Sequence, residues 1–187
     1  NMKKINVSTM VFMALCIVIN ILGGFIALTL KLPIYIDTIG TIMSAITLGP
    51  ICGGIVGILT SIVNGATYDP VSFFFIPVQL VIGVSTGLLF RSGKFNGIKS
   101  ILSIILITVL GSITSSIITA LVFDGVTSSG SSMIVAVLKN SGVNIITSVF
   151  STQIFTDLLD KAISFFIVFT VLKAMPNSIR LNLSREK

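Results

Sequence analysis

The stretch LPIYIDTIGTIMSAITLGPICGGIVGILTSIVNG, residues Leu32 to Gly65, decides the fold class of the chain. It contains two apolar runs that only Gly49-Pro50 separates, and this pair predicts a tight turn between two short helices. Small residues recur at every fourth position of the second run and give one helix face without bulky side chains: Gly49, Gly53, Gly57, Ser61 and Gly65. Such faces let membrane helices approach closely, so the stretch predicts tightly packed membrane helices.

The composition of the whole chain also indicates a membrane protein. Of its 187 residues, 53% are hydrophobic and 10% are charged, whereas soluble domains carry about 25% charged residues. The chain has no histidine and no G-x-x-x-x-G-K-[ST] sequence, which excludes His-dependent hydrolysis and a P-loop ATPase. Cys16 and Cys52 lie in separate apolar runs without C-x-x-C spacing. We therefore expect an integral membrane protein that is not an enzyme and needs no metal or cofactor.

Apolar runs of membrane-spanning length predict an all-α bundle of six transmembrane helices in a single domain. The expected spans are Thr9–Leu30, Ile34–Leu48, Ile51–Ala66, Val71–Phe90, Ile101–Phe123 and Thr152–Leu172. Residues 124–151 are expected to form an outer loop. Within them, residues 133–150 predict either a short outer helix or an extension of the last span, and a count of seven spans remains an alternative.

The charges predict the orientation of this bundle. The side of the two termini holds nine basic residues: Lys3, Lys4, Arg91, Lys94, Lys99, Lys173, Arg180, Arg185 and Lys187. By the positive-inside rule, both termini are expected in the cytoplasm. The net charge of +6 then reflects cations near lipid headgroups, and no nucleic-acid partner is expected. All acidic residues except Glu186 fall toward the outer half: Asp37, Asp69, Asp124, Asp157 and Asp160.

Polar and aromatic residues of the outer half predict a small-molecule site that opens to the outside of the cell. Ionisable groups inside apolar segments are costly and commonly face a cavity or a partner. The candidate binding residues are Asp37, Thr38, Asn64, Tyr68, Phe74, Gln79, Asn144, Gln153 and Asp157. Their chemistry suits a neutral or cationic ring compound with hydroxyl groups. Two structural alternatives stay open: Asp37 could cap a helix, and Asp157 could pair with Lys161 four residues later.

Three segments together resemble the substrate-binding S component of energy-coupling factor (ECF) transporters. They are Leu32 to Gly65, Pro77-Val78-Gln79 with VIGVSTGLLFR ending at Arg91, and DLLDKAISFFIVFTVLKAMP from Asp157 to Pro176. The resemblance implies a six-helix protein that captures a micronutrient, nucleoside-like or B-vitamin-like, from outside the cell. It also implies partners, namely a transmembrane coupling subunit and two cytosolic ATPases.

The resemblance further implies a docking face on the first helix. Family members dock through an A-x-x-x-A face, whereas this chain has Ala14 followed by Val18, with Cys16, Asn20 and Gly24 on another ridge. Ala14, Val18 and Asn20 are therefore the candidate docking residues. Two other functions stay open: a stand-alone transporter would take up substrate without an ATPase, and a membrane sensor or assembly protein would tolerate substitutions in the outer site.

Overall fold

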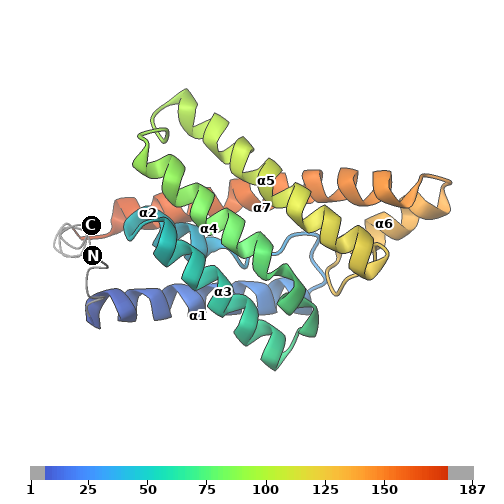
Figure 1. Cartoon of the computed structure of the whole chain (residues 1–187), viewed down its shortest axis with the longest axis horizontal. Helices are drawn as coiled ribbons and strands as arrows, with labels where there is room; N and C mark the ends of the chain where they lie inside the picture. Colours follow the sequence, from blue (N-terminus) through green and yellow to red (C-terminus); the bar gives the residue numbers. More distant parts are fainter. Residues whose placement is uncertain (1–6, 177–187) are drawn as a thin grey trace.

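Eight helical segments form the described part of the chain, residues 7–176, in a computed structural model. Figure 1 shows that α1 begins and α7 ends at the same end of the bundle. The segments are α1 (Val7–Thr29), α2 (Ile39–Thr47), α3 (Pro50–Thr67), the 3-10 helix η1 (Pro70–Phe75), α4 (Ile76–Arg91), α5 (Ile98–Phe123), α6 (Ser131–Asn140) and α7 (Ile145–Ala174). The predicted topology signals at Lys3, Lys4, Arg180, Arg185 and Lys187 lie outside the described residues.

Four segments are long and apolar enough to cross a membrane: α1, α3, η1 continued by α4, and α5. The fifth long helix, α7, has 30 residues, which corresponds to about 45 Å at about 1.5 Å per residue. It differs from the other four because Asp157, Asp160 and Lys161 interrupt its apolar sequence. The all-helical membrane class is thus confirmed, whereas the count of six spans stays a prediction.

The predicted second span, Ile34–Leu48, is wrong in its first part. Residues 30–38, here called the connector, are not helical, and α2 has only nine residues. Such a helix is about 13.5 Å long, less than half of a hydrocarbon core of about 30 Å. The connector places Ile36 at φ 54°, and the N–H groups of Tyr35 and Ile36 donate to Asp160 Oδ1 at 3.2 and 2.7 Å. A carboxylate on α7 thus replaces the helical hydrogen bonds expected there.

The outer segment 124–151 contains more helix than predicted. Both alternatives for residues 133–150 hold in part, because α6 is a separate short helix and α7 begins at Ile145, ahead of the expected Thr152. Asn144 is the N-cap of α7, and its side-chain oxygen accepts the N–H of Ile146 at 2.9 Å. An N-cap of this kind satisfies a backbone donor that would otherwise lack a partner.

The small-residue face of α3 packs as the sequence predicts. A Cβ atom added to Gly53 would lie 2.5 Å from the Cβ of Ala45 on α2, and one added to Gly83 on α4 would lie 2.5 Å from the carbonyl carbon of Gly53. No real side chain fits at either distance, so the α3 backbone packs directly against the Ala45 methyl group of α2 and against the backbone of α4. The predicted close approach of these helices is confirmed.

The bundle is built around α2, in which every residue from Ile39 to Ile46 is buried. Ile42 packs in a core with Ile82 of α4, Ile107 of α5 and Phe165 of α7, all at most 1% exposed. Large apolar side chains on α1, α5 and α7 instead remain exposed. A continuous apolar exterior around a packed interior is what a lipid-embedded bundle requires.

Candidate functional site

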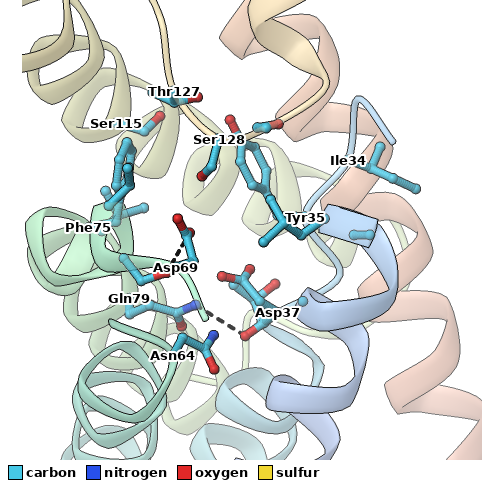
Figure 2. Close-up of a pocket in the computed structure, with 18 of the residues that line it drawn as sticks. Ile34, Tyr35, Asp37, Asn64, Asp69, Phe75, Gln79, Ser115, Thr127 and Ser128 are labelled. Atoms are coloured by element: carbon cyan, nitrogen blue, oxygen red, sulfur yellow. Dashed lines mark hydrogen bonds between the residues drawn. The ribbon is translucent and has the colours of Figure 1, made fainter. Parts of the chain in front are cut away.

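A cavity with a volume of about 90 Å³ lies between the connector, α1, α3, η1, α4, α5, α7 and the loop before α6. In Figure 2, Asp37, Asn64 and Gln79 gather at one side of it, and Tyr35, Thr127 and Ser128 gather at another. The ionisable and amide side chains that line it are Tyr35, Asp37, Asn64, Tyr68, Asp69, Gln79, Asp157 and Lys161. Apolar walls with a few convergent polar groups are typical of small-molecule sites.

Six of the nine candidate binding residues line this cavity. They are Asp37, Thr38, Asn64, Tyr68, Gln79 and Asp157. They come from the connector, α3, the turn after α3, α4 and α7, so the bundle collects residues that are more than a hundred positions apart in sequence. The sequence therefore identified most of the polar lining, although a role of these residues in binding is still a prediction.

The other three candidates do not line the cavity. Phe74 is 51% exposed and packs edge-on against Phe123 at 5.2 Å between ring centres, while the neighbouring Phe75 lines the cavity. Asn144 caps α7. Gln153 is buried behind the lining, where it accepts from the Tyr35 hydroxyl at 3.1 Å and donates to Ser115 Oγ at 3.2 Å. Its side chain thus holds two lining residues in position.

Asp160, on α7, was not a candidate, yet it organises one wall. Its side chain is fully buried, and Oδ1 accepts the connector N–H groups of Tyr35 and Ile36. Its Oδ2 accepts from Lys161 Nζ. The alternative that Asp157 pairs with Lys161 is therefore wrong, because the ammonium pairs with its sequence neighbour. The only sequence signal for Asp160 was its place among the acidic residues of the outer half.

Asp157 has different partners from Asp160. Its Oδ2 accepts from Ser112 Oγ at 2.8 Å and from Ser115 Oγ at 3.3 Å, both on α5. These two bonds hold the carboxylate against α5 and at the cavity wall. Hydroxyl donors stabilise an ionised carboxylate that lies away from water.

A network of buried polar side chains on α1, α2, α3 and α4 holds part of the cavity lining in position. Asn20 of α1 is fully buried; its Nδ2 donates to Thr41 Oγ1 at 2.9 Å and to Thr60 Oγ1 at 3.0 Å. Thr41 in turn donates to Gln79 Oε1 at 2.9 Å, and Gln79 Nε2 donates to the backbone oxygen of Asp37 at 3.1 Å. The network therefore fixes both the Gln79 amide and the path of the connector.

The same network corrects one docking prediction. With Asn20 fully buried, it cannot contact another protein, and Cys16 on the same ridge is also fully buried. Ala14 and Val18 are on the opposite, exposed face of α1, where Val18 is 49% exposed. Only this face of the helix is open to a partner.

Two buried lining atoms have no hydrogen-bond partner within residues 7–176. They are Thr38 Oγ1 and Asn64 Oδ1. Buried polar atoms in native proteins are nearly always satisfied, by protein, water or ligand. Thr38 is the N-cap of α2 without a side-chain cap bond, so the alternative that Asp37 caps this helix is wrong. These atoms are free to bind a molecule in the cavity.

Asp37 lies in the connector, outside the helices that are long enough to cross a membrane. Burial raises the pKa of its carboxyl group to about 6; the nearby Asp160 carboxylate acts in the same direction, and the Lys161 ammonium opposes it. The Asp37 side chain therefore changes charge close to neutral pH. An ionised Asp37 adds negative charge to the cavity only above that pKa.

The family model of the ECF transporter substrate-specific component matches residues 8–172. The match covers most of the sequence, and the chain belongs to this family of membrane transport proteins. The resemblance inferred from the sequence is thereby confirmed, and the members of this family are transporter subunits and not enzymes. No curated protein and no solved structure matches the chain.

Proposed function

We propose that the chain captures a small micronutrient from outside the cell and delivers it to an ECF coupling subunit driven by two cytosolic ATPases. The observation that carries this proposal is the cavity, where Thr38 Oγ1 and Asn64 Oδ1 have no partner among residues 7–176 and are available to a ligand. The family match supports the transport role. A nucleoside-like or B-vitamin-like compound is the proposed substrate.

The proposed orientation places the cavity on the outer side. In Figure 1, α4 ends and α5 begins toward the bundle end where α1 begins and α7 ends. Arg91 and Lys173 lie in the last turns of α4 and α7, Lys94 lies in the loop between α4 and α5, and Lys99 lies in the first turn of α5. An excess of such cations marks the cytoplasmic side. We take α2 and α7 as the fifth and sixth crossings, which makes the number of crossings even.

The proposed docking surface is the exposed face of α1 around Ala14 and Val18. Small side chains let a partner helix approach closely in the membrane. This face is on the side of α1 opposite to the buried Asn20, so a docked subunit would not disturb the network beneath the cavity.

Thermal stabilisation of the detergent-purified protein tests capture. The panel contains nucleosides, nucleobases and B-group vitamins, each added far above the expected Kd. A ligand that binds only the folded state stabilises it by about 4 kcal/mol at about 1,000 times Kd. One strong hit would support capture and identify the substrate class. If no compound shifted the melting curve, while an S component of known substrate did respond, the sensor function would be favoured instead.

Uptake assays separate the proposal from the stand-alone alternative. Cells that produce this chain without any ECF ATPase are compared with cells that also produce the coupling subunit and the ATPases. We expect accumulation of the panel hit only in the second case. Uptake by the chain alone would contradict the need for an ATPase and favour the stand-alone transporter.

A further inference from the structure

We infer that the molecule bound in the cavity carries a positive charge. This inference rests on the proposed capture function and adds the charge class of the ligand. Three carboxylates, those of Asp37, Asp69 and Asp157, line the cavity within the described residues, against the one ammonium of Lys161. The lining therefore holds more acidic than basic side chains.

The Lys161 ammonium is a poor anchor for an anionic ligand, because a neighbouring carboxylate already compensates its charge. It is bonded to Asp160 Oδ2, and only 4% of its side chain is exposed. An anion could bind the remaining N–H groups of Lys161 only beside the Asp160 carboxylate, which already compensates the ammonium charge, or by separating the pair. Breaking one partner from a buried ion pair is strongly unfavourable. Among residues 7–176, the lining thus offers a cation carboxylates that are in no ion pair, and it offers an anion only an ammonium that already has a counter-charge.

Asp157 presents an acceptor to the cavity. Both of its hydrogen bonds within the described residues go to Oδ2, from Ser112 and Ser115, which leaves Oδ1 for a ligand. Asn64 Oδ1, on α3, is a second acceptor without a partner in that part of the chain. A cationic ligand that also carries N–H groups would satisfy acceptors of both kinds.

Aromatic side chains complete a lining that suits an organic cation. Tyr35, Tyr68 and Phe75 border the same space as the carboxylates. Aromatic rings attract ammonium and aromatic cations through their negative faces, most strongly when water is excluded. A site of low polarity also strengthens the attraction between unlike charges. Carboxylates and aromatic rings together favour an organic cation over a metal ion.

The size of the cavity limits the ligand further. A volume of about 90 Å³ corresponds to roughly six to nine waters, at about 10–15 Å³ for each water. This is the size of one six-membered ring with a substituent. A cation whose buried part is a single substituted ring suits this volume.

A matched set of three probes tests the charge at constant ring size. Nicotinate is an anion, nicotinamide is neutral and 1-methylnicotinamide is a cation, and all three have one pyridine-type ring. Their affinities for the purified protein are measured by calorimetry or thermal shift at pH 7.5, together with the wider panel sorted by charge. We expect 1-methylnicotinamide to bind at least tenfold more tightly than nicotinamide, with nicotinate the weakest, and the tightest panel ligand to be a cation.

The outcomes separate this inference from the proposed function. If the tightest ligand of the probes and panel is neutral or anionic, capture stands and the charge inference is overturned. If nothing binds, both are overturned.

Charge-neutralising variants test the residues. Asp157→Asn, Asp37→Asn and Asp69→Asn should each weaken binding of the cationic ligand at least fivefold and change binding of its neutral analogue less than twofold. Asp124→Asn is the matched control, since that side chain is 81% exposed and lies outside the cavity. Because three carboxylates can be substituted separately, the other two variants still test the inference if one variant fails to fold. Unchanged cation affinity in every folded variant would overturn the inference.

Discussion

At the residue scale, the nearby carboxylates of Asp160 and Asp37 have different roles. Asp160 uses both oxygens within the protein, for two connector N–H groups and for Lys161. Asp37 lines the cavity and has a raised pKa. The first is a positioning residue, and the second is a candidate contact to the ligand. Their substitutions should therefore have different effects.

Asp160→Asn should destabilise the fold. The amide keeps the shape of the side chain but removes the charge that compensates the buried Lys161 ammonium, and such losses cost about 3–5 kcal/mol. Chemical unfolding of the detergent-solubilised protein measures the change in the free energy of unfolding. The control is Asp124→Asn, which breaks an exposed pair with Lys139 and should change stability by less than about 1 kcal/mol. Equal effects of the two variants would contradict the role of Asp160.

The affinity for a cationic ligand should rise with pH. Because the pKa of Asp37 is raised to about 6, its carboxyl group is largely neutral at pH 5 and largely charged at pH 7. The attraction for a cation is therefore absent below the pKa and present above it. Binding titrations from pH 5 to pH 7.5 should show this increase in the wild type. In Asp37→Asn the profile should be flatter; an identical slope in both would assign the titration to another group.

Gly24→Leu should block the cavity and leave the fold intact. A Cβ atom at Gly24 would lie 3.0 Å from the Tyr68 hydroxyl and 3.3 Å from Asp37 Cβ, so a longer side chain enters the cavity. We expect loss of ligand-induced stabilisation without loss of cooperative unfolding. The control is Gly54→Ala, where the added methyl group meets the flexible end of Leu80 away from the cavity. Retained binding in Gly24→Leu would show that the ligand lies elsewhere.

At the scale of elements, sequence reasoning succeeded where local signals decide the structure. The Gly-Pro turn and the small-residue face located α3 within one residue at each end of the predicted span, and α5 ends where expected, at Phe123. It failed in the connector, because the partner of its backbone is Asp160, more than a hundred residues away along the chain. The sequence pattern of residues 30–38 contains no signal for a hydrogen bond between their backbone and another helix.

The contact between α3 and α4 should tolerate no side chain at its centre. A Cβ atom at Gly83 would lie 2.5 Å from the carbonyl carbon of Gly53, and backbone cannot move aside as a side chain can. Gly83→Ala should lower the free energy of unfolding by about 1–3 kcal/mol or more. Gly111→Ala is the comparison for stability, because its methyl group would meet Ile82 at 3.4 Å, an ordinary contact. Similar unfolding curves for both variants would contradict backbone contact at Gly83.

At the scale of the whole molecule, most polar residues of the cavity lining were predictable from the sequence, but the buried residues that hold the lining in position were not. Apolar segments that carry polar residues indicated Asp37, Asn64, Gln79 and Asp157, all of which line the cavity. Asn20 was assigned to the wrong surface, since sequence spacing groups residues on a helix face without saying which face is buried. The packing of α1, α2 and α3 around the Asn20 amide decides that question.

The exposed face of α1 should matter for transport but not for binding. Ala14→Trp places a bulky ring where a partner helix would approach. Ala14 is exposed and is not one of the residues that line the cavity. We expect unchanged ligand affinity of the isolated chain and loss of ATP-driven uptake with the coupling subunit and ATPases. Leu121→Trp is the control, at a position of α5 that is 80% exposed. Full uptake by Ala14→Trp would exclude this face as the docking surface.

The bond between Asp160 and the connector also has an evolutionary consequence. Asp160 holds the backbone N–H groups of Tyr35 and Ile36 and not their side chains. The course of the chain over the cavity is therefore independent of most side chains that the connector carries. Descendants of this protein can exchange those side chains and acquire new substrates while one aspartate, far away in sequence, preserves the architecture.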